Sequence, residues 1–236
     1  ARAWWRQVPS RATRRIQALR LKLRLARMDG NRDEALETAR LLSKHQAFSA
    51  TATASLVKAL VLDSVRQTHD WDGLKRVWSR LSEADRAHPD VALAVAAQAS
   101  NWWTAGHDQP VGPMAQQVAT WLLPLWGRWA QLDDLQRQRL VLVLEQAIPH
   151  LGAEWLARVE QTQQQWPQHA SLQYLAGQAC LQRRLWGKAQ QLLGQASQSL
   201  KDPTMLRRVW CSLAKLAQER GDVAAEQAAW KTAAQI

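Results

Sequence analysis

The residues in this chain that could most readily bind a ligand are arginines near its start. Residues 1–27 contain nine arginine and lysine side chains and no carboxylate. Arg20, Arg24 and Arg27 recur at spacings of four and three residues, which places them on one face of a helix. Guanidinium groups in such a row can hold carboxylates in bidentate ion pairs, so they favour an acidic protein segment, an anionic lipid or nucleic acid as ligand. A solvated helix face is the plainer alternative.

Other side chains that could do chemistry do not form a recognisable site. The sequence has six histidines and two cysteines, but no metal-binding spacing, no phosphate-binding glycine loop and no nucleophile elbow. Cys180 and Cys211 lie among apolar residues within predicted helices, which is typical of reduced thiols. The adjacent carboxylates Asp133 and Asp134 stand at a predicted helix start and are interpreted as capping residues. We therefore expect a protein that is not an enzyme.

The composition predicts an all-α fold. Ala, Leu, Gln and Arg dominate, and all four are good helix formers. One Tyr and one Phe accompany 14 Trp, so tryptophan supplies most of the aromatic surface that can be buried between helices. The net charge of +11 again favours an anionic partner.

Four similar turn strings, each between two amphipathic stretches, predict a repeat architecture. They begin at residues 30, 69, 184 and 221. The first two are 39 residues apart (69 − 30), the last two are 37 apart (221 − 184), and the gap of 115 (184 − 69) is close to three such periods. A period in the thirties is typical of tetratricopeptide repeats. We expect a right-handed solenoid of about six antiparallel helix pairs over residues 11–236, after a basic lead-in segment (1–10) and with an irregular insertion at about 106–130.

Small and bulky residues at equivalent places predict how the helix pairs pack. Gly177 and Ala214 should let a second helix approach closely. Trp78, Leu193 and Trp230 occupy the same late position on the second helix of their pairs and are predicted to lie in the core.

The segment 121–129 is unusual because it contains three tryptophans and Pro124, which should kink or end a helix. It could form an exposed apolar patch that docks on a membrane or another subunit. Alternatively, the segment packs back on its neighbouring repeats, and this second interpretation is favoured.

In helical solenoids of this kind, the first helix of each pair lines the concave face, where a partner would bind. Basic residues outnumber acidic ones among the positions predicted to face inward. The predicted partner-binding residues are Gln17, Arg20, Arg24, Arg27, Asp63, Arg66, Gln67, Tyr174, Gln178, Gln182, Arg208 and Lys215.

Several strings also resemble the HemY family. The segments 172–177 and 183–190 look like its signature stretch, and segments 74–78 and 154–160 are similar to other parts of it. The resemblance covers roughly residues 11–235. It implies the soluble tetratricopeptide region of a proteobacterial inner-membrane protein associated with a late step of haem biosynthesis, on the cytoplasmic side and carried by an N-terminal anchor that this sequence lacks. The family supplies no catalytic residues.

The resulting expectation is a scaffold that binds other proteins, haem-biosynthesis enzymes among them, and that has no cofactor of its own. Two alternatives stay open. A nucleic-acid-binding repeat protein would use the basic face, although base stacking normally needs exposed aromatic residues. A protein that binds porphyrin or haem directly would use the same arginines for the propionates. The sequence does not determine the oligomeric state.

Overall fold

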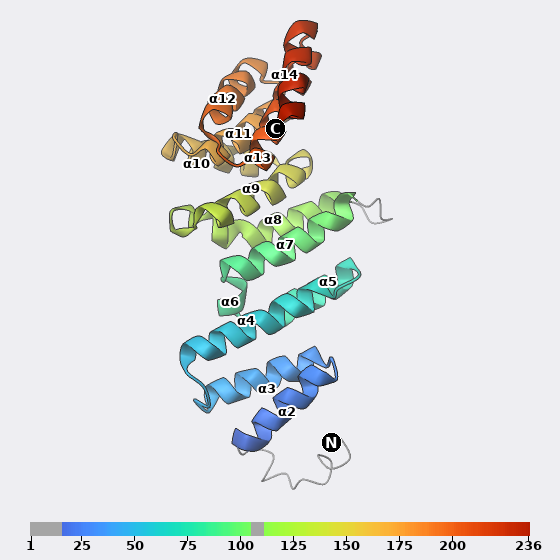
Figure 1. Ribbon diagram of the computed structural model, residues 1–236, viewed down its shortest axis with the longest axis vertical. Coiled ribbons are helices and arrows are strands. Elements are labelled where there is room, and N and C mark those ends of the chain that lie inside the picture. Colours follow the sequence, from blue (N-terminus) through green and yellow to red (C-terminus); the bar gives the residue numbers. More distant parts are fainter. Residues whose placement is uncertain (1–15, 105–110) are drawn as a thin grey trace. The chain divides into compact units, whose positions relative to one another are not determined.

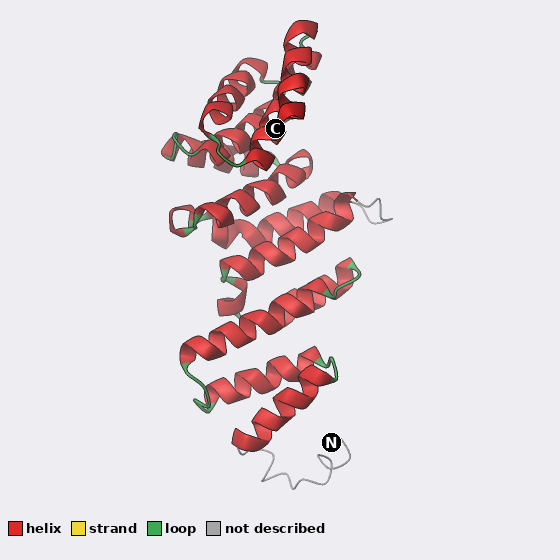
Figure 2. Cartoon of the chain, viewed as in Figure 1, coloured by secondary structure: helices red, strands yellow, loops and turns green. Residues whose placement is uncertain are grey.

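The computed structural model describes residues 16–104 and 111–236, and these residues form helices joined by short turns (Figures 1 and 2). No strand occurs within these ranges, which confirms the all-α prediction. The predicted basic lead-in at residues 1–10 lies outside the described residues. The chain divides into two compact units, residues 1–98 and 99–236, and each is described by itself.

The first unit consists of two consecutive helix pairs and a short helix. Its elements are α2 (Ile16–Met28), α3 (Arg32–Lys44), α4 (Ala50–Arg66), α5 (Trp71–Arg80) and α6 (Glu83–Arg86), and α7 (Pro89–Thr104) begins in it. Helix α2 packs on α3, and α3 packs on α4. The core contains Leu19 and Leu23 of α2, Leu42 of α3, Val61 of α4 and Leu74 of α5, all nearly inaccessible to solvent.

Turn chemistry explains where these helices begin. Gly30 has a φ of 70°, a left-handed conformation that glycine adopts without a steric cost. The side chains of Asn31, Ser49 and Asp70 then accept hydrogen bonds from backbone N–H groups in the first turns of α3, α4 and α5. The predicted turns at residues 30 and 69 are therefore present.

The second unit contains the end of α7 and, in its described residues, seven further α-helices and two short 3-10 helices. Its elements are α8 (Val111–Trp126), η1 (Trp129–Gln131), α9 (Asp134–Ala147), η2 (Ile148–His150), α10 (Ala153–Gln165), α11 (Ala170–Gln182), α12 (Trp186–Ser199), α13 (Pro203–Glu219) and α14 (Val223–Gln235). Residues 111–126 of the predicted irregular insertion form a regular helix, and Pro124 lies within its last turn. Asp133 caps α9 with a reciprocal capping box, which confirms its predicted role.

Helices α11 and α12 pack closely against each other in the second unit. A Cβ atom added to Gly177 would lie 2.8 Å from two side-chain carbons of Leu193, which is itself fully buried. A side chain at position 177 would therefore clash with Leu193, in agreement with the prediction that Gly177 lets a second helix approach closely. Trp78 is buried as predicted, but Trp230 of α14 is 40% exposed, so its predicted place in the core is wrong.

The tryptophan-rich segment packs inward. Trp126 and Trp129 are buried, and their ring centroids lie 5.3 Å apart. Trp126 also meets the edge of Trp155 at 5.8 Å, and its indole N–H donates to the hydroxyl of Thr162 at 3.1 Å. This part of the chain is a core cluster, and the alternative of an exposed docking patch is wrong for these two rings.

Several side-chain hydrogen bonds between helices connect residues about one sequence period apart. Their partners are separated by 29 to 36 residues. The pairs are Arg32–Asp63 and Lys58–Asp90 in the first unit, and Trp126–Thr162, Tyr174–Glu145 and Gln178–Ser212 in the second. These separations are shorter than the 37 to 39 residues between equivalent turns, and other side-chain hydrogen bonds, such as Arg40–Asp85 and Arg208–Glu145, join residues 45 and 63 positions apart.

Candidate functional site

The arginines of α2 form an exposed basic row in the first unit. Arg24 and Arg27 are exposed, and neither makes an ion pair with any described residue. Gln17 is exposed earlier on the same helix. We call Arg24 and Arg27 the α2 basic row.

Arg20 is exposed as well, but it also makes contacts within the protein. Its Nη2 donates to the carbonyl of Ala47 at 2.7 Å, and its guanidinium carbon lies 5.0 Å from the centroid of the Phe48 ring. These contacts attach α2 to the segment between α3 and α4. Arg20 is therefore held in a structural contact, which the spacing on α2 alone could not indicate.

Of the predicted site residues at the end of α4, one makes an internal ion pair and two are exposed. Asp63 accepts from Nε of Arg32 at 2.8 Å, an ion pair that links α4 to α3. Arg66 and Gln67, at the end of α4, are exposed. Of this group, only Arg66 offers a charge without an ion pair among the described residues.

In the second unit, three of the predicted partner-binding residues, Tyr174, Gln178 and Arg208, belong to a polar cluster. Tyr174 has no exposed surface, and its hydroxyl donates to Oε1 of Glu145 at 2.6 Å. Oε2 of the same carboxylate pairs with Nη1 of Arg208 at 3.2 Å. Burial, followed by the charge of Glu145 and the hydrogen bond to it, raises the pKa of the Tyr174 hydroxyl far above its usual range. The prediction that Tyr174 is accessible to a partner is wrong.

The cluster joins three alternating helices, α9, α11 and α13, and includes a further bond. Gln178 of α11 donates to the hydroxyl of Ser212, which donates in turn to the carbonyl of Arg208 at 2.8 Å. Gln182 and Lys215, the remaining predicted residues, are exposed at the ends of α11 and α13. The structure thus uses Glu145, Tyr174 and Arg208 to fix neighbouring pairs, and leaves Gln182 and Lys215 accessible.

Most described carboxylates already have a partner within the protein. Four of them cap helices: Asp70, Asp133, Asp202 and Asp222. Ten others form ion pairs: Asp33, Glu34, Asp63, Asp72, Asp85, Asp90, Asp134, Glu145, Glu154 and Glu160. Most described acidic side chains therefore lie at helix N-termini or pair with basic side chains, whereas none of them pairs with Arg24 or Arg27 of the α2 basic row.

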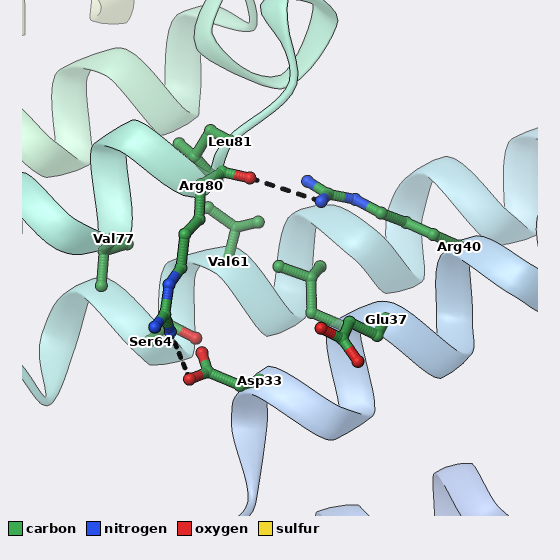
Figure 3. A pocket seen from close by; sticks show the side chains of 9 residues that line it. Asp33, Glu37, Arg40, Val61, Ser64, Val77, Arg80 and Leu81 are labelled. Carbon is green, nitrogen blue, oxygen red and sulfur yellow. Dashed lines mark hydrogen bonds and ion pairs between the residues drawn. The ribbon is translucent and has the colours of Figure 1, made fainter.

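A cavity of about 330 Å³ lies between α3, α4 and α5 in the first unit (Figure 3). Val61, Val77 and Leu81 give it apolar walls. Arg80 extends across it to an ion pair with Asp33, as Figure 3 shows. The cavity is large enough for a side chain or a small ligand.

The charges of this cavity disfavour an anionic ligand. Arg40 pairs with Asp85 at 2.7 Å and donates to the carbonyl of Arg80 at 3.4 Å, and Arg80 is paired with Asp33. Glu37 lines the cavity and has no ion pair with a described residue. The remaining charge in the cavity is therefore negative, which is unfavourable for porphyrin propionates.

The described histidines and cysteines form no ligand cluster. No group of three or more His, Cys, Asp and Glu side chains in the described ranges could hold a metal ion. Burial, followed by the charge of Arg137, lowers the pKa of His169, whose ring meets Trp129 and Trp166 edge-on. Burial likewise raises the pKa of the Cys180 thiol, which lowers its reactivity.

Comparison with known proteins returned no matching family model, no matching curated protein and no matching solved structure. Within the described ranges, none of the helices combines the length and the apolar character that spanning a bilayer requires.

Proposed function

We propose that this protein is a non-enzymatic interaction scaffold that binds an acidic segment of a protein partner. The observation that carries the proposal is the α2 basic row, which stays exposed and forms no ion pair with a described residue, while most of the described carboxylates are engaged internally. Two guanidinium groups on one helix face can bind successive carboxylates in bidentate geometry.

The helix pairs and their side-chain bonds at intervals of about one sequence period support a tetratricopeptide-like solenoid as the architecture of this scaffold. In such a solenoid α2 is the first helix of the first pair. Because first helices line the concave face, the α2 basic row would face the bound partner.

The resemblance to the HemY family extends the proposal to a biological setting. On that basis the chain is the soluble part of a protein anchored in a proteobacterial inner membrane, on the cytoplasmic side, and its partners include enzymes of late haem biosynthesis. This part of the proposal rests on the strings at residues 74–78, 154–160, 172–177 and 183–190.

The experiment is a pull-down from a proteobacterial membrane extract with the protein as bait and mass-spectrometric identification of what binds. The test variant is Arg24→Glu/Arg27→Glu, which reverses the α2 basic row. The matched control is Lys201→Glu/Lys231→Glu, which makes the same change of net charge at two exposed lysines elsewhere. Both variants should keep native circular dichroism, because all four side chains are exposed.

Three outcomes are informative. The scaffold proposal is supported if the control variant binds partners with acidic segments and the test variant does not. The HemY setting is supported if these partners include haem-biosynthesis enzymes. Recovery of nucleic acid with a steep loss at moderate salt would replace the proposal with the nucleic-acid alternative. Equal binding by both variants would refute the role of the α2 basic row. A porphyrin titration followed by absorbance separately tests the third alternative.

A further inference from the structure

Helix α2 has a second regular face, opposite the one that packs on α3. The residues of its buried face are Leu19, Leu23 and Ala26. The residues of the opposite face are all exposed: Gln17, Leu21, Arg24 and Met28. We call these four residues the α2 outer face. Leu21 is 41% exposed and Met28 is 76% exposed. A single exposed apolar side chain is common on protein surfaces, but these two recur on one side of the same helix.

The α2 outer face has the spacing of a coiled-coil seam. Its residues are separated by four, three and four positions, which is the alternation of the a and d positions of a heptad repeat. Leu21 and Met28 occupy the apolar positions of this seam, and Gln17 and Arg24 occupy the other two. A stripe with this spacing stays on one side of a helix and is the surface on which a second helix packs.

The distance between the two apolar side chains fits a helical partner better than an extended one. Leu21 and Met28 are seven residues apart, which is about 10.5 Å along the helix axis. A second helix repeats this interval between its own residues i and i+7, so two of its apolar side chains can contact both. Side chains on one face of an extended segment recur at about 7 Å and about 14 Å, so an extended segment matches only one of the two.

The arginines on and beside the α2 outer face determine the charge of the partner. Arg20 and Arg27 flank the seam at the positions where coiled coils form salt bridges between helices. Arg24 and Arg27 form no ion pair with a described residue. A second copy of α2 would bring like charges together, which is unfavourable. Residues 1–15 of the same chain contain five arginines and no carboxylate, so their charge also has the wrong sign. The partner that fits is therefore acidic.

We propose that the acidic segment bound by this protein is an amphipathic helix that packs its apolar face on Leu21 and Met28 and places carboxylates against Arg24 and Arg27. This inference rests on the proposed function, because it concerns the same helix, and it adds the conformation of the partner and its apolar contact. Burial of the apolar side chains supplies affinity, and the arginines select the sign and the register of the partner. The partner segment should carry apolar residues seven positions apart, flanked by Asp or Glu.

The experiment measures the binding of blocked three-heptad peptides to the full chain by isothermal titration calorimetry. The probe has Leu at the first position of each heptad, Glu at the two positions that flank the apolar stripe, and Ala and Gln elsewhere. The ligand control has the same composition, and therefore the same net charge, in an order that distributes its leucines around the helix.

The protein variant is Leu21→Gln/Met28→Gln, which removes the apolar pair and keeps a good helix former at both positions. Its matched control is Leu135→Gln/Val223→Gln, which makes the same kind of change at two exposed apolar residues of the second unit. Arg24→Glu/Arg27→Glu tests the charge separately. Circular dichroism checks that every variant keeps its helix content.

We expect the probe to bind, and the ligand control to bind at least about tenfold more weakly, equivalent to about 1.4 kcal/mol of binding free energy. Leu21→Gln/Met28→Gln should weaken binding of the probe by a similar factor, whereas Leu135→Gln/Val223→Gln should not change it. Equal binding of the two peptides, or equal affinity of these two variants, would overturn the inference. If Arg24→Glu/Arg27→Glu then loses both peptides, the proposed function stands without the helical partner.

Two further measurements test other occupants of the α2 outer face. Sedimentation with phosphatidylserine vesicles tests a membrane surface, and analytical ultracentrifugation tests a second copy of the chain. Either association, if Leu21→Gln/Met28→Gln abolishes it and the probe does not bind, would overturn the proposal. Absence of probe binding at millimolar concentration would overturn it as well, and the pull-down with Arg24→Glu/Arg27→Glu would then decide the proposed function independently.

Discussion

Replacing Gly177 with alanine tests how tightly α11 and α12 are packed. The new Cβ atom would lie 2.8 Å from Cγ and Cδ2 of Leu193 and 3.4 Å from its backbone nitrogen. Carbon atoms in ordinary contact are about 3.5–4.0 Å apart, so the overlap is about 0.7–1.2 Å. Leu193 has no exposed surface into which it could turn. We expect the resulting overpacking to cost about 1–3 kcal/mol.

A second glycine separates this steric cost from helix propensity. Gly194 lies within α12, and a Cβ atom added to it would meet no atom within 4 Å. Alanine is better than glycine in a helix by about 0.5–1 kcal/mol, so Gly194→Ala should raise the free energy of unfolding by that amount. The difference between Gly177→Ala and Gly194→Ala, about 1–3 kcal/mol, is then the steric term alone.

The assay is urea unfolding followed by far-UV circular dichroism for both single variants and for the double-mutant cycle with Leu193→Ala. Truncating Leu193 removes the two atoms that clash, so the steric cost of Gly177→Ala should disappear in the double variant. The reasoning is refuted if Gly177→Ala is as stable as Gly194→Ala, or if the cycle shows no coupling between residues 177 and 193.

Three further predictions concern other parts of the second unit. Trp126→Ala should lower the free energy of unfolding by about 3–5 kcal/mol because it leaves a cavity. Trp230 is exposed, so Trp230→Ala should lower it by less than about 1 kcal/mol. Urea unfolding measures both losses, and equal losses would contradict the inward packing of Trp126. The pKa of His169 is lowered in the folded protein because burial disfavours the charged ring, so the stability it contributes is full above the ordinary value of about 6.5 and falls as the pH drops below it. His169→Gln should reduce this pH dependence in urea unfolding, and an unchanged dependence would rule out His169 as its source. Cys180 should react with iodoacetamide more slowly than Cys211, because it is buried and its pKa is raised; peptide mapping by mass spectrometry gives both rates, and a faster Cys180 would contradict the burial.

The order of helices could be predicted because local signals determine it. Gly30, Asp70 and Asp133 mark turns and caps through their own backbone or side chain, so their effect is readable without knowing what packs nearby. The close approach at Gly177 was also predictable, because glycine weakens a helix interior and is retained there mainly where a neighbouring helix needs the space.

The accessibility of the site residues could not be predicted in the same way. Tyr174 and Gln178 share a helix face. The hydroxyl of the buried Tyr174 donates to Glu145 on α9, which lies 29 residues earlier in the chain. Arg20 stays exposed, but its hydrogen-bond partner Ala47 lies 27 residues away and could not be predicted from the spacing on α2. Periodicity places a residue on a face, whereas the identity of the neighbouring helix decides whether that residue is exposed.

The short interval between bonded partners has a consequence for how the chain folds. Because Arg32–Asp63, Lys58–Asp90 and Tyr174–Glu145 are separated by about 30 residues, the entropy lost in closing each loop is modest. Proteins dominated by contacts of low sequence separation fold quickly. Within each unit, a helix pair can therefore dock on the previous one during synthesis, without waiting for the end of the chain.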